Sequence, residues 1–234
     1  MRITRNMRWI LRTRGRLHYT WFIAIILMSI AVTTQFSLLY PLWQRIVLGI
    51  TASLFFLVIM TFREFILSLL ATSRGIRIER VTLFVFGGAP QIVKETSLPS
   101  LELLLAVTGM LSNIIITMVF YIIYVMLAYS GNIIVNVLVQ WLAFIFLMLT
   151  IIHFIPGLPL DGGRLLRALL WKNTGNYERA THITGWIGSS IGILGVIGGI
   201  LVIILLRQWF EGVLLIFLGW VLQSAATYTR RQAI

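Results

Sequence analysis

The chain contains 234 residues, of which 59% are hydrophobic and 11% are charged, and its formal net charge is +12. Soluble domains contain about 45–50% apolar and about 25% charged residues, so this composition excludes an ordinary soluble domain and indicates an integral membrane protein. Cysteine is absent, which excludes disulfide bonds and thiolate metal sites. No interleaving of aromatic and basic residues accompanies the positive charge, so we expect no nucleic-acid partner.

Six apolar segments are candidates for transmembrane helices, because a helix needs about 20 apolar residues to cross the hydrocarbon core of a bilayer. In chain order they cover about 19–35, 46–71, 101–127, 133–155, 182–206 and 210–227. We therefore predict a single membrane domain over residues 1–234, an all-α integral membrane protein built as a six-transmembrane-helix bundle.

The distribution of basic residues predicts how this bundle is oriented. Six arginines precede the first predicted span, and ten further basic residues fall in segments that would lie on the same side. Only Arg45 and Arg207 fall in loops on the other side. Cytoplasmic loops are enriched in Lys and Arg, so we expect both termini in the cytoplasm. The basic amino-terminal arm is expected to contact membrane lipid.

The second predicted span contains two adjacent charges, Arg63 and Glu64. A charge in hydrocarbon costs roughly 3 kcal/mol on insertion scales, so an ionisable residue there is a functional-site hypothesis by default. Neighbouring residues on a helix point about 100° apart and do not face each other. We therefore expect each charge to have its own partner elsewhere in the bundle.

Residues 76–95, between the second and third spans, alternate polar and apolar residues before a turn at Gly87 and Gly88. This pattern predicts a small cytoplasmic β-hairpin or sheet element. Two interpretations stay open for it. The sheet is either purely structural, or its exposed edge pairs with an extended peptide.

The fifth predicted span is rich in glycine. Gly188 and Gly192 lie four residues apart, as do Gly195 and Gly199, and this is the spacing of small residues at close helix contacts. We expect this face to pack within the chain in preference to forming a dimer.

The fourth predicted span ends in a stretch rich in proline and glycine around Asp161, the only aspartate in the chain. It reads His153-Phe-Ile-Pro-Gly-Leu-Pro-Leu-Asp-Gly-Gly-Arg164. Irregular backbone at membrane depth is tolerated only where it is buried in protein or lines a watery cavity. Asp161 either caps the following helix or belongs to a site, and its depth and isolation favour a site.

This stretch resembles the Asp-Gly motif of the site-2 protease family of intramembrane zinc metalloproteases. The family pattern is Asn-x-x-Pro-x-x-Pro-Leu-Asp-Gly-Gly-Arg, and His153 stands here in place of the leading Asn. Residues 74–88 resemble the strand segment of the family, and residues 108–113 resemble its Ala-Gly-Pro-x-x-Asn motif. The resemblance covers nearly the whole chain and implies a site-2 protease core in the plasma membrane of a prokaryote.

In that family, the second span carries His-Glu-x-x-His, whose histidines bind zinc together with the aspartate of the later motif, while the glutamate activates water. The resemblance puts Arg63 and Leu67 in place of the two histidines and retains Glu64 and Asp161. Arginine offers donors only and leucine has no ligand atom. Zinc is the cofactor of the family, but because of these two replacements we expect none in this chain.

Two arrangements of these residues remain open. The guanidinium of Arg63 could replace the metal and pair with Asp161, while Glu64 pairs with Asn113, His153, backbone or water, or is protonated. Alternatively, Glu64, His153 and Asp161 could bind zinc, since these ligand types suit a catalytic zinc site. We expect the ion pair of Arg63 and Asp161.

We therefore predict a catalytically degenerate member of the family that binds a transmembrane helix of a substrate or partner protein. The residues that the resemblance assigns to substrate binding are Phe86, Gly87, Gly88, Asn113, Pro156 and Pro159. One alternative is an active intramembrane metalloprotease with atypical zinc ligands. A second is a small transporter, because broken helices and buried charges also mark solute pathways. The sequence predicts no oligomeric state.

Overall fold

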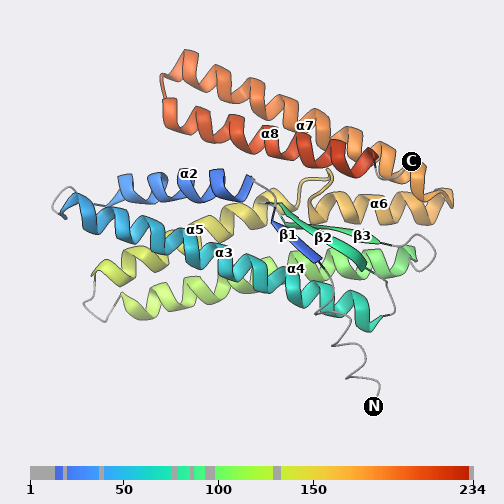
Figure 1. Cartoon of the computed structure of the whole chain (residues 1–234), viewed down its shortest axis with the longest axis horizontal. Coiled ribbons are helices and arrows are strands. Elements are labelled where there is room, and N and C mark those ends of the chain that lie inside the picture. The colour runs from blue at the N-terminus through green and yellow to red at the C-terminus, as the bar shows by residue number, and fades with distance from the viewer. Residues whose placement is uncertain are drawn as a thin grey trace.

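In the computed structural model, the described residues are 14–17, 20–36, 40–74, 78–84, 87–92, 98–128 and 133–231. They form three strands and seven helices (Figure 1). The strands are β1 (Arg14–Leu17), β2 (Ile78–Phe84) and β3 (Gly87–Ile92). The helices are α2 (Thr20–Gln35), α3 (Leu42–Ser73), α4 (Pro99–Leu127), α5 (Ile133–His153), α6 (Asp161–Thr174), α7 (Tyr177–Leu206) and α8 (Trp209–Arg231).

Five of the described helices are long and apolar enough to cross a membrane, namely α3, α4, α5, α7 and α8. Helix α2 is apolar but has only 16 residues. At 1.5 Å per residue it is about 24 Å long, which is less than the hydrocarbon thickness of about 30 Å. The predicted count of six spans is therefore wrong, because the first apolar segment is too short as a helix.

The β element also differs from the predicted fold class. Strand β1 pairs in parallel with β2, and β2 pairs antiparallel with β3, in the order β1-β2-β3. The segment 76–95 is therefore not a self-contained hairpin, because a strand from before the first helix completes the sheet. Local alternation could not reveal this parallel partner, since α2 and α3 separate the two strands in the chain.

The helices pack around a core shared by α2, α3, α5 and α8. Its buried side chains include Trp21, Met60, Phe146, Leu160 and Val221. Helices α7 and α8 lie side by side as an antiparallel pair, and α6 lies next to them, while α3, α4 and α5 lie on the other side of the molecule (Figure 1). Much of the remaining apolar surface of these helices is exposed, as expected where lipid covers it.

Glycine sets the close approach of α7 to α8. A Cβ added at Gly192 would lie 2.7 Å from the carbonyl oxygen of Gly219, and one at Gly219 would lie 2.6 Å from the carbonyl oxygen of Gly192. Gly199 faces α8 in the same way. The predicted packing of this face within the chain is confirmed, except that Gly188 faces Leu158 in the segment before α6.

The segment between α5 and α6 places Asp161 in the interior. The amide of Leu158 donates to the carbonyl oxygen of Thr184 on α7, 3.4 Å away. Helix α6 then begins at Asp161, its N-cap residue is Leu160, and no side chain caps it. The interpretation of Asp161 as a helix cap is therefore wrong, and its carboxylate is available to the neighbouring helices.

Candidate functional site

Three helices build the candidate site. Helix α3 supplies Arg63 and Glu64, α4 contributes Gly109 and Ser112, and α6 begins with Asp161. We call these five residues the Arg63 cluster. Arg63 and Asp161 are 3% exposed and Glu64 is 8% exposed. Charges buried this deeply must be compensated by partners, because the desolvation penalty of an unpaired ion is several kcal/mol.

Every nitrogen of the Arg63 guanidinium donates a hydrogen bond. Nη2 donates to Asp161 Oδ2 at 2.5 Å and to the carbonyl oxygen of Gly109 at 2.9 Å. Nε donates to Ser112 Oγ at 3.0 Å, and Nη1 donates to Glu64 Oε1. Charge-assisted bonds of this kind are stronger than neutral ones. The arginine therefore joins α3, α4 and α6 at one point.

Gly109 permits this close approach of α4 to the carboxylate. A Cβ added at Gly109 would lie 2.7 Å from Asp161 Oδ2 and 2.8 Å from Asp161 Oδ1. Atoms at these separations would overlap, so any larger residue would displace Asp161. Because the same glycine also accepts a hydrogen bond from Arg63 through its carbonyl oxygen, the cluster depends on its small size.

Glu64 does not have the separate partner expected from its place on the helix. Its carboxylate contacts the guanidinium of Arg63, the preceding residue. The expectation that the two charges have separate partners is therefore wrong, because the long Arg63 side chain reaches sideways. Two carboxylates thus share one guanidinium. A second cation lies nearby, since Arg164 Nη1 is 4.0 Å from Asp161 Oδ1.

His153 lies beside Asp161, and Asn113 follows Ser112 on α4. His153 is 1% exposed, and its Nδ1 lies 2.8 Å from the carbonyl oxygen of Leu149. Its Nε2 lies 3.9 Å from Asp161 Oδ2. The side chain of Asn113 is fully buried, and neither its Oδ1 nor its Nδ2 has a hydrogen-bond partner among the described residues. The side chain of Asn113 is therefore not a hydrogen-bond partner of Glu64.

The other residues that the resemblance assigns to substrate binding lie apart from these contacts. Phe86 is outside the described residues. Gly87 and Gly88 begin β3, where they pair with β2. Pro156 and Pro159 lie in the segment between α5 and α6, the first exposed and the second buried. None of these four described residues bonds to the guanidinium at the centre of the cluster.

A second buried ion pair was not predicted from the sequence. Arg167 on α6 pairs with Glu102 on α4, with its Nε 2.6 Å from Glu102 Oε1. The guanidinium also lies over the ring of Tyr177, 5.1 Å from its centroid. Burial opposes the charged form, but Glu102 and Tyr177 outweigh it and raise the pKa of Arg167 above its usual value. The available signal was a lone glutamate at the start of an apolar span, which needs a cation.

The residues at the site do not fit the zinc ion that the family resemblance implies. Among the described residues, no group of three or more His, Asp and Glu side chains is arranged to hold a metal ion. Arg63 occupies the carboxylates of Glu64 and Asp161. Leu67, one helical turn further along α3 and also buried, has no ligand atom.

Known proteins resemble this chain in sequence. It is 31% identical over 192 residues to a Synechocystis protein provisionally named as a zinc metalloprotease, a match covering 80% of this chain and 48% of that protein. It is 35% identical over 137 residues to a zinc metalloprotease of Methanocaldococcus jannaschii, covering 57% of this chain and 38% of the relative. The chain thus spans about half the length or less of the curated relatives it matches. No family model matches it.

The fold resembles a solved structure as well. The site-2 protease from Methanocaldococcus jannaschii superposes with a TM-score of 0.69 and 26% sequence identity, covering 93% of this chain and 90% of that one. The fold and its apolar helices therefore define a multi-helix membrane protein of the site-2 protease type. Together with the relatives named as zinc metalloproteases, this likeness supports the site-2 protease family for this chain.

Proposed function

We propose that this chain is a catalytically inactive member of the site-2 protease family, which binds transmembrane segments of substrate or partner proteins without cleaving them. The observation that supports the proposal is the Arg63 guanidinium, which donates to both Asp161 and Glu64. By resemblance, these two carboxylates would be the third zinc ligand and the general base of the family. An arginine does not ligate a cation, because it offers only donors.

The ion pair of Arg63 with Asp161 takes the role of the metal in this proposal. A fixed cation keeps both carboxylates paired in a buried site, so the architecture persists without zinc. Without a metal to lower the pKa of a bound water, Glu64 has no activated nucleophile to serve. The site would then hold helices together instead of hydrolysing peptide bonds.

Binding of an extended segment is proposed for the sheet and the nearby helices. Strand β3 has β2 as its only neighbour within the described part of the sheet, so its outer edge offers backbone groups for pairing. The amide atoms of Asn113 are buried and unsatisfied, so a peptide would bond to them only after the helices around Asn113 move apart. Gly87, Gly88, Pro156 and Pro159 would contribute to the same role by resemblance.

The proposed setting is the plasma membrane of a prokaryote, with both termini in the cytoplasm. Five spans alone would place the termini on opposite sides, so this orientation requires α2 together with its flanking residues to carry the chain across. The exposed apolar helices support contact with membrane lipid. The basic residues concentrated in segments on one side of the predicted spans support the orientation.

Metal analysis and a cleavage assay test the inactive assignment together. We expect the purified full chain to contain no stoichiometric zinc and to leave a single-span model substrate uncleaved after incubation with zinc. Glu64→Gln is the matched control, because it preserves the size of the side chain while removing the family base. Stoichiometric zinc, together with cleavage that Glu64→Gln abolishes, would overturn the proposal.

An active metalloprotease with atypical ligands is the second candidate, favoured by one distance. His153 Nε2 lies 3.9 Å from Asp161 Oδ2, so two side chains of ligand type are near neighbours. This candidate requires Arg63 to leave both carboxylates. It predicts zinc that is lost from both Asp161→Asn and His153→Ala, whereas the inactive assignment predicts no zinc in the parent or in either variant.

A further inference from the structure

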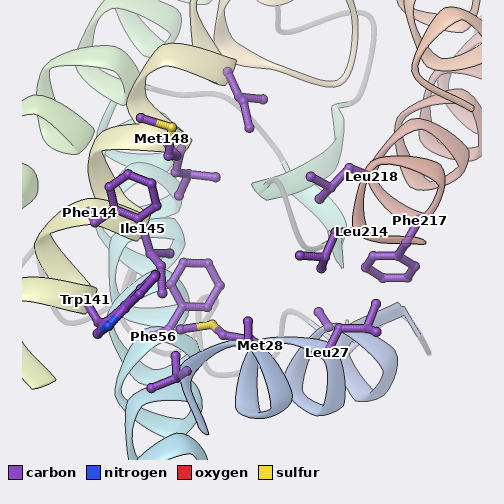
Figure 2. A pocket seen from close by; sticks show the side chains of 15 residues that line it. Leu27, Met28, Phe56, Trp141, Phe144, Ile145, Met148, Leu214, Phe217 and Leu218 are labelled. Carbon is purple, nitrogen blue, oxygen red and sulfur yellow. The ribbon is translucent and has the colours of Figure 1, made fainter. Parts of the chain in front are cut away.

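An apolar cavity of about 270 Å³ lies between α2, α3, α5 and α8, separate from the Arg63 cluster. Figure 2 shows Phe144, Ile145 and Met148 of α5 on one side of an open space and Leu214 and Leu218 of α8 on the other. Met28 and Leu27 of α2 border the same space. Every residue that lines it is apolar or aromatic.

Burial of the α8 side chains in and near the cavity decreases toward the start of the helix. Val221 is fully buried in the main core and Leu222 is nearly so. Leu214, about two turns nearer to the start of α8, lines the cavity and is only partly buried. The α8 wall of the cavity is therefore less buried on the side nearer the start of the helix at Trp209.

The size and lining of the cavity select the kind of occupant. A polar ligand is unsuitable, because every side chain that lines the cavity is apolar or aromatic and could not pair with its polar groups. Water is also unsuitable, because a buried water needs two to four polar partners. A cavity of about 150 Å³ lined by Leu, Ile and Phe accepts benzene, so this larger one has room for a longer hydrocarbon.

A cation lies at the end of the α2 wall. Ala31 and Val32 line the cavity, and the next residue, Thr33, accepts hydrogen bonds through its carbonyl oxygen from Arg45 Nε at 3.2 Å and Arg45 Nη2 at 3.1 Å. The remaining nitrogen, Nη1, has no partner among the described residues. The half-buried guanidinium therefore keeps donors that suit a phosphate oxygen.

Exposed tryptophans mark the depth of this arginine in the bilayer. Trp43 is 64% exposed and Trp209 is 70% exposed, at the ends of α3 and α8 that lie at this side of the bundle. Tryptophan gathers at the headgroup level of membranes. Phe56 lies eleven residues beyond Arg45 on α3, or about 16 Å deeper at 1.5 Å per residue. Arg45 and the cavity therefore lie at the depths expected for the phosphate and the acyl chain of one lipid.

We propose that the cavity between α2, α5 and α8 binds one acyl chain of an anionic phospholipid whose phosphate pairs with Arg45. The apolar lining accepts the hydrocarbon, and charge complementarity at Arg45 selects the headgroup. This lipid site does not depend on whether the Arg63 cluster replaces zinc. Bound lipid would fill the space that separates α8 from α2 and α5 and so stabilise the contact of the α7 and α8 pair with the rest of the bundle.

Photo-crosslinking tests the proposal with a defined probe. The full chain is placed in lipid nanodiscs that contain phosphatidylglycerol with a photoreactive group near the end of one acyl chain, and the labelled peptides are located by mass spectrometry. We expect labelling of α2, α5 and α8 at cavity residues such as Met28, Met148 and Leu218. A phosphatidylcholine probe with the same chain is expected to label them several-fold less.

Matched variants separate the headgroup contact from the acyl-chain contact. Arg45→Gln is expected to reduce labelling about fivefold, the effect of losing one basic residue at an anionic surface. Arg207→Gln is its control, because Arg207 is exposed at the same end of the bundle and takes no part in the proposed headgroup contact. Ala31→Phe fills the cavity and is expected to abolish labelling. Leu218→Phe fills it from the opposite wall, and a cooperative thermal transition verifies that each variant is folded.

Each contrary outcome identifies what the cavity does instead. Equal labelling by the two headgroups, or equal effects of Arg45→Gln and Arg207→Gln, would overturn the phosphate contact. Labelling that persists in folded Ala31→Phe and Leu218→Phe would overturn the acyl-chain site. Displacement of the probe by a single-span peptide, but not by unlabelled phosphatidylglycerol, would assign the space to a transmembrane helix and overturn the proposal.

Discussion

The Arg63 cluster and the Glu102–Arg167 pair place two buried arginines against carboxylates in the same bundle. Both connect α6 to its neighbours, and both are almost fully buried. They differ in the number of acids around the cation. Arg63 contacts Glu64 and Asp161, whereas Arg167 pairs with a single carboxylate among the described residues, that of Glu102, and lies over the ring of Tyr177.

This difference separates a substituted site from an ordinary structural contact. A buried ion pair is weak evidence for stability, since the cost of desolvation often offsets the attraction between the charges. Two carboxylates from different helices that share one cation are harder to explain by packing alone. This comparison supports the proposal that Arg63 replaces the metal of the family. Substitutions at the two arginines test whether they differ in the expected way.

Arg63→Ala has the largest expected effect. Removing the guanidinium leaves Glu64 and Asp161 buried without their shared partner, and breaking a buried pair costs about 3–5 kcal/mol. Unfolding of the purified protein in detergent by denaturant measures the loss. Arg63→Lys is the control, which retains the charge but loses the fork of donors and should fall between the parent and Arg63→Ala. An Arg63→Ala protein more stable than the parent would refute the role of this cation.

Arg167→Ala should cost less, about 3 kcal/mol, at the lower end for a broken buried pair. Only one carboxylate loses its partner, and Glu102 lies in the first turn of α4, where the helix dipole favours a negative charge. The same unfolding experiment measures it. Glu102→Gln in combination should recover part of the loss, and Arg179→Ala, an exposed control on α7, should change stability little. A loss as large as that of Arg63→Ala would remove the proposed distinction.

Arg63→His with Leu67→His should convert the cluster into a zinc site. The two imidazoles would lie one turn apart on α3, facing Asp161, and with that carboxylate would supply three ligands. Zinc at 100 times its dissociation constant should raise the free energy of unfolding of this variant by about 2.7 kcal/mol. The parent should not respond to zinc. Adding Asp161→Asn to the double variant should remove the response, and an unchanged response would place the metal elsewhere.

Gly109→Ala should have the smallest effect of the four, about 1–3 kcal/mol, which is typical of overpacking. Its Cβ would overlap the carboxylate of Asp161. Gly198→Ala is the matched control, because its Cβ would meet only Leu215 at 3.6 Å, an ordinary contact. Thermal unfolding of both variants measures the difference. Equal stability of the two would show that Asp161 moves away from α4 without cost.

Part of the site was predictable because it depends on residue chemistry. Arg63 cannot serve as a metal ligand in any fold, and a lone Asp161 among prolines and glycines at the end of an apolar span indicates a site. The contact of Arg63 with Glu64 was not predictable from helical angles, because the reach of a flexible side chain exceeds the separation that those angles imply. The pair of Glu102 and Arg167 joins residues far apart in the chain.

The sequence by itself determined that this is a membrane protein with a charged site, because composition and residue chemistry do not depend on the fold. Only the tertiary structure decided that one guanidinium serves two carboxylates, that α2 is too short to span the bilayer, and that β1 joins the sheet. These features depend on distances between segments remote in the chain and on where each helix ends. Local patterns carry no record of such distances, because they follow from how all the helices pack together.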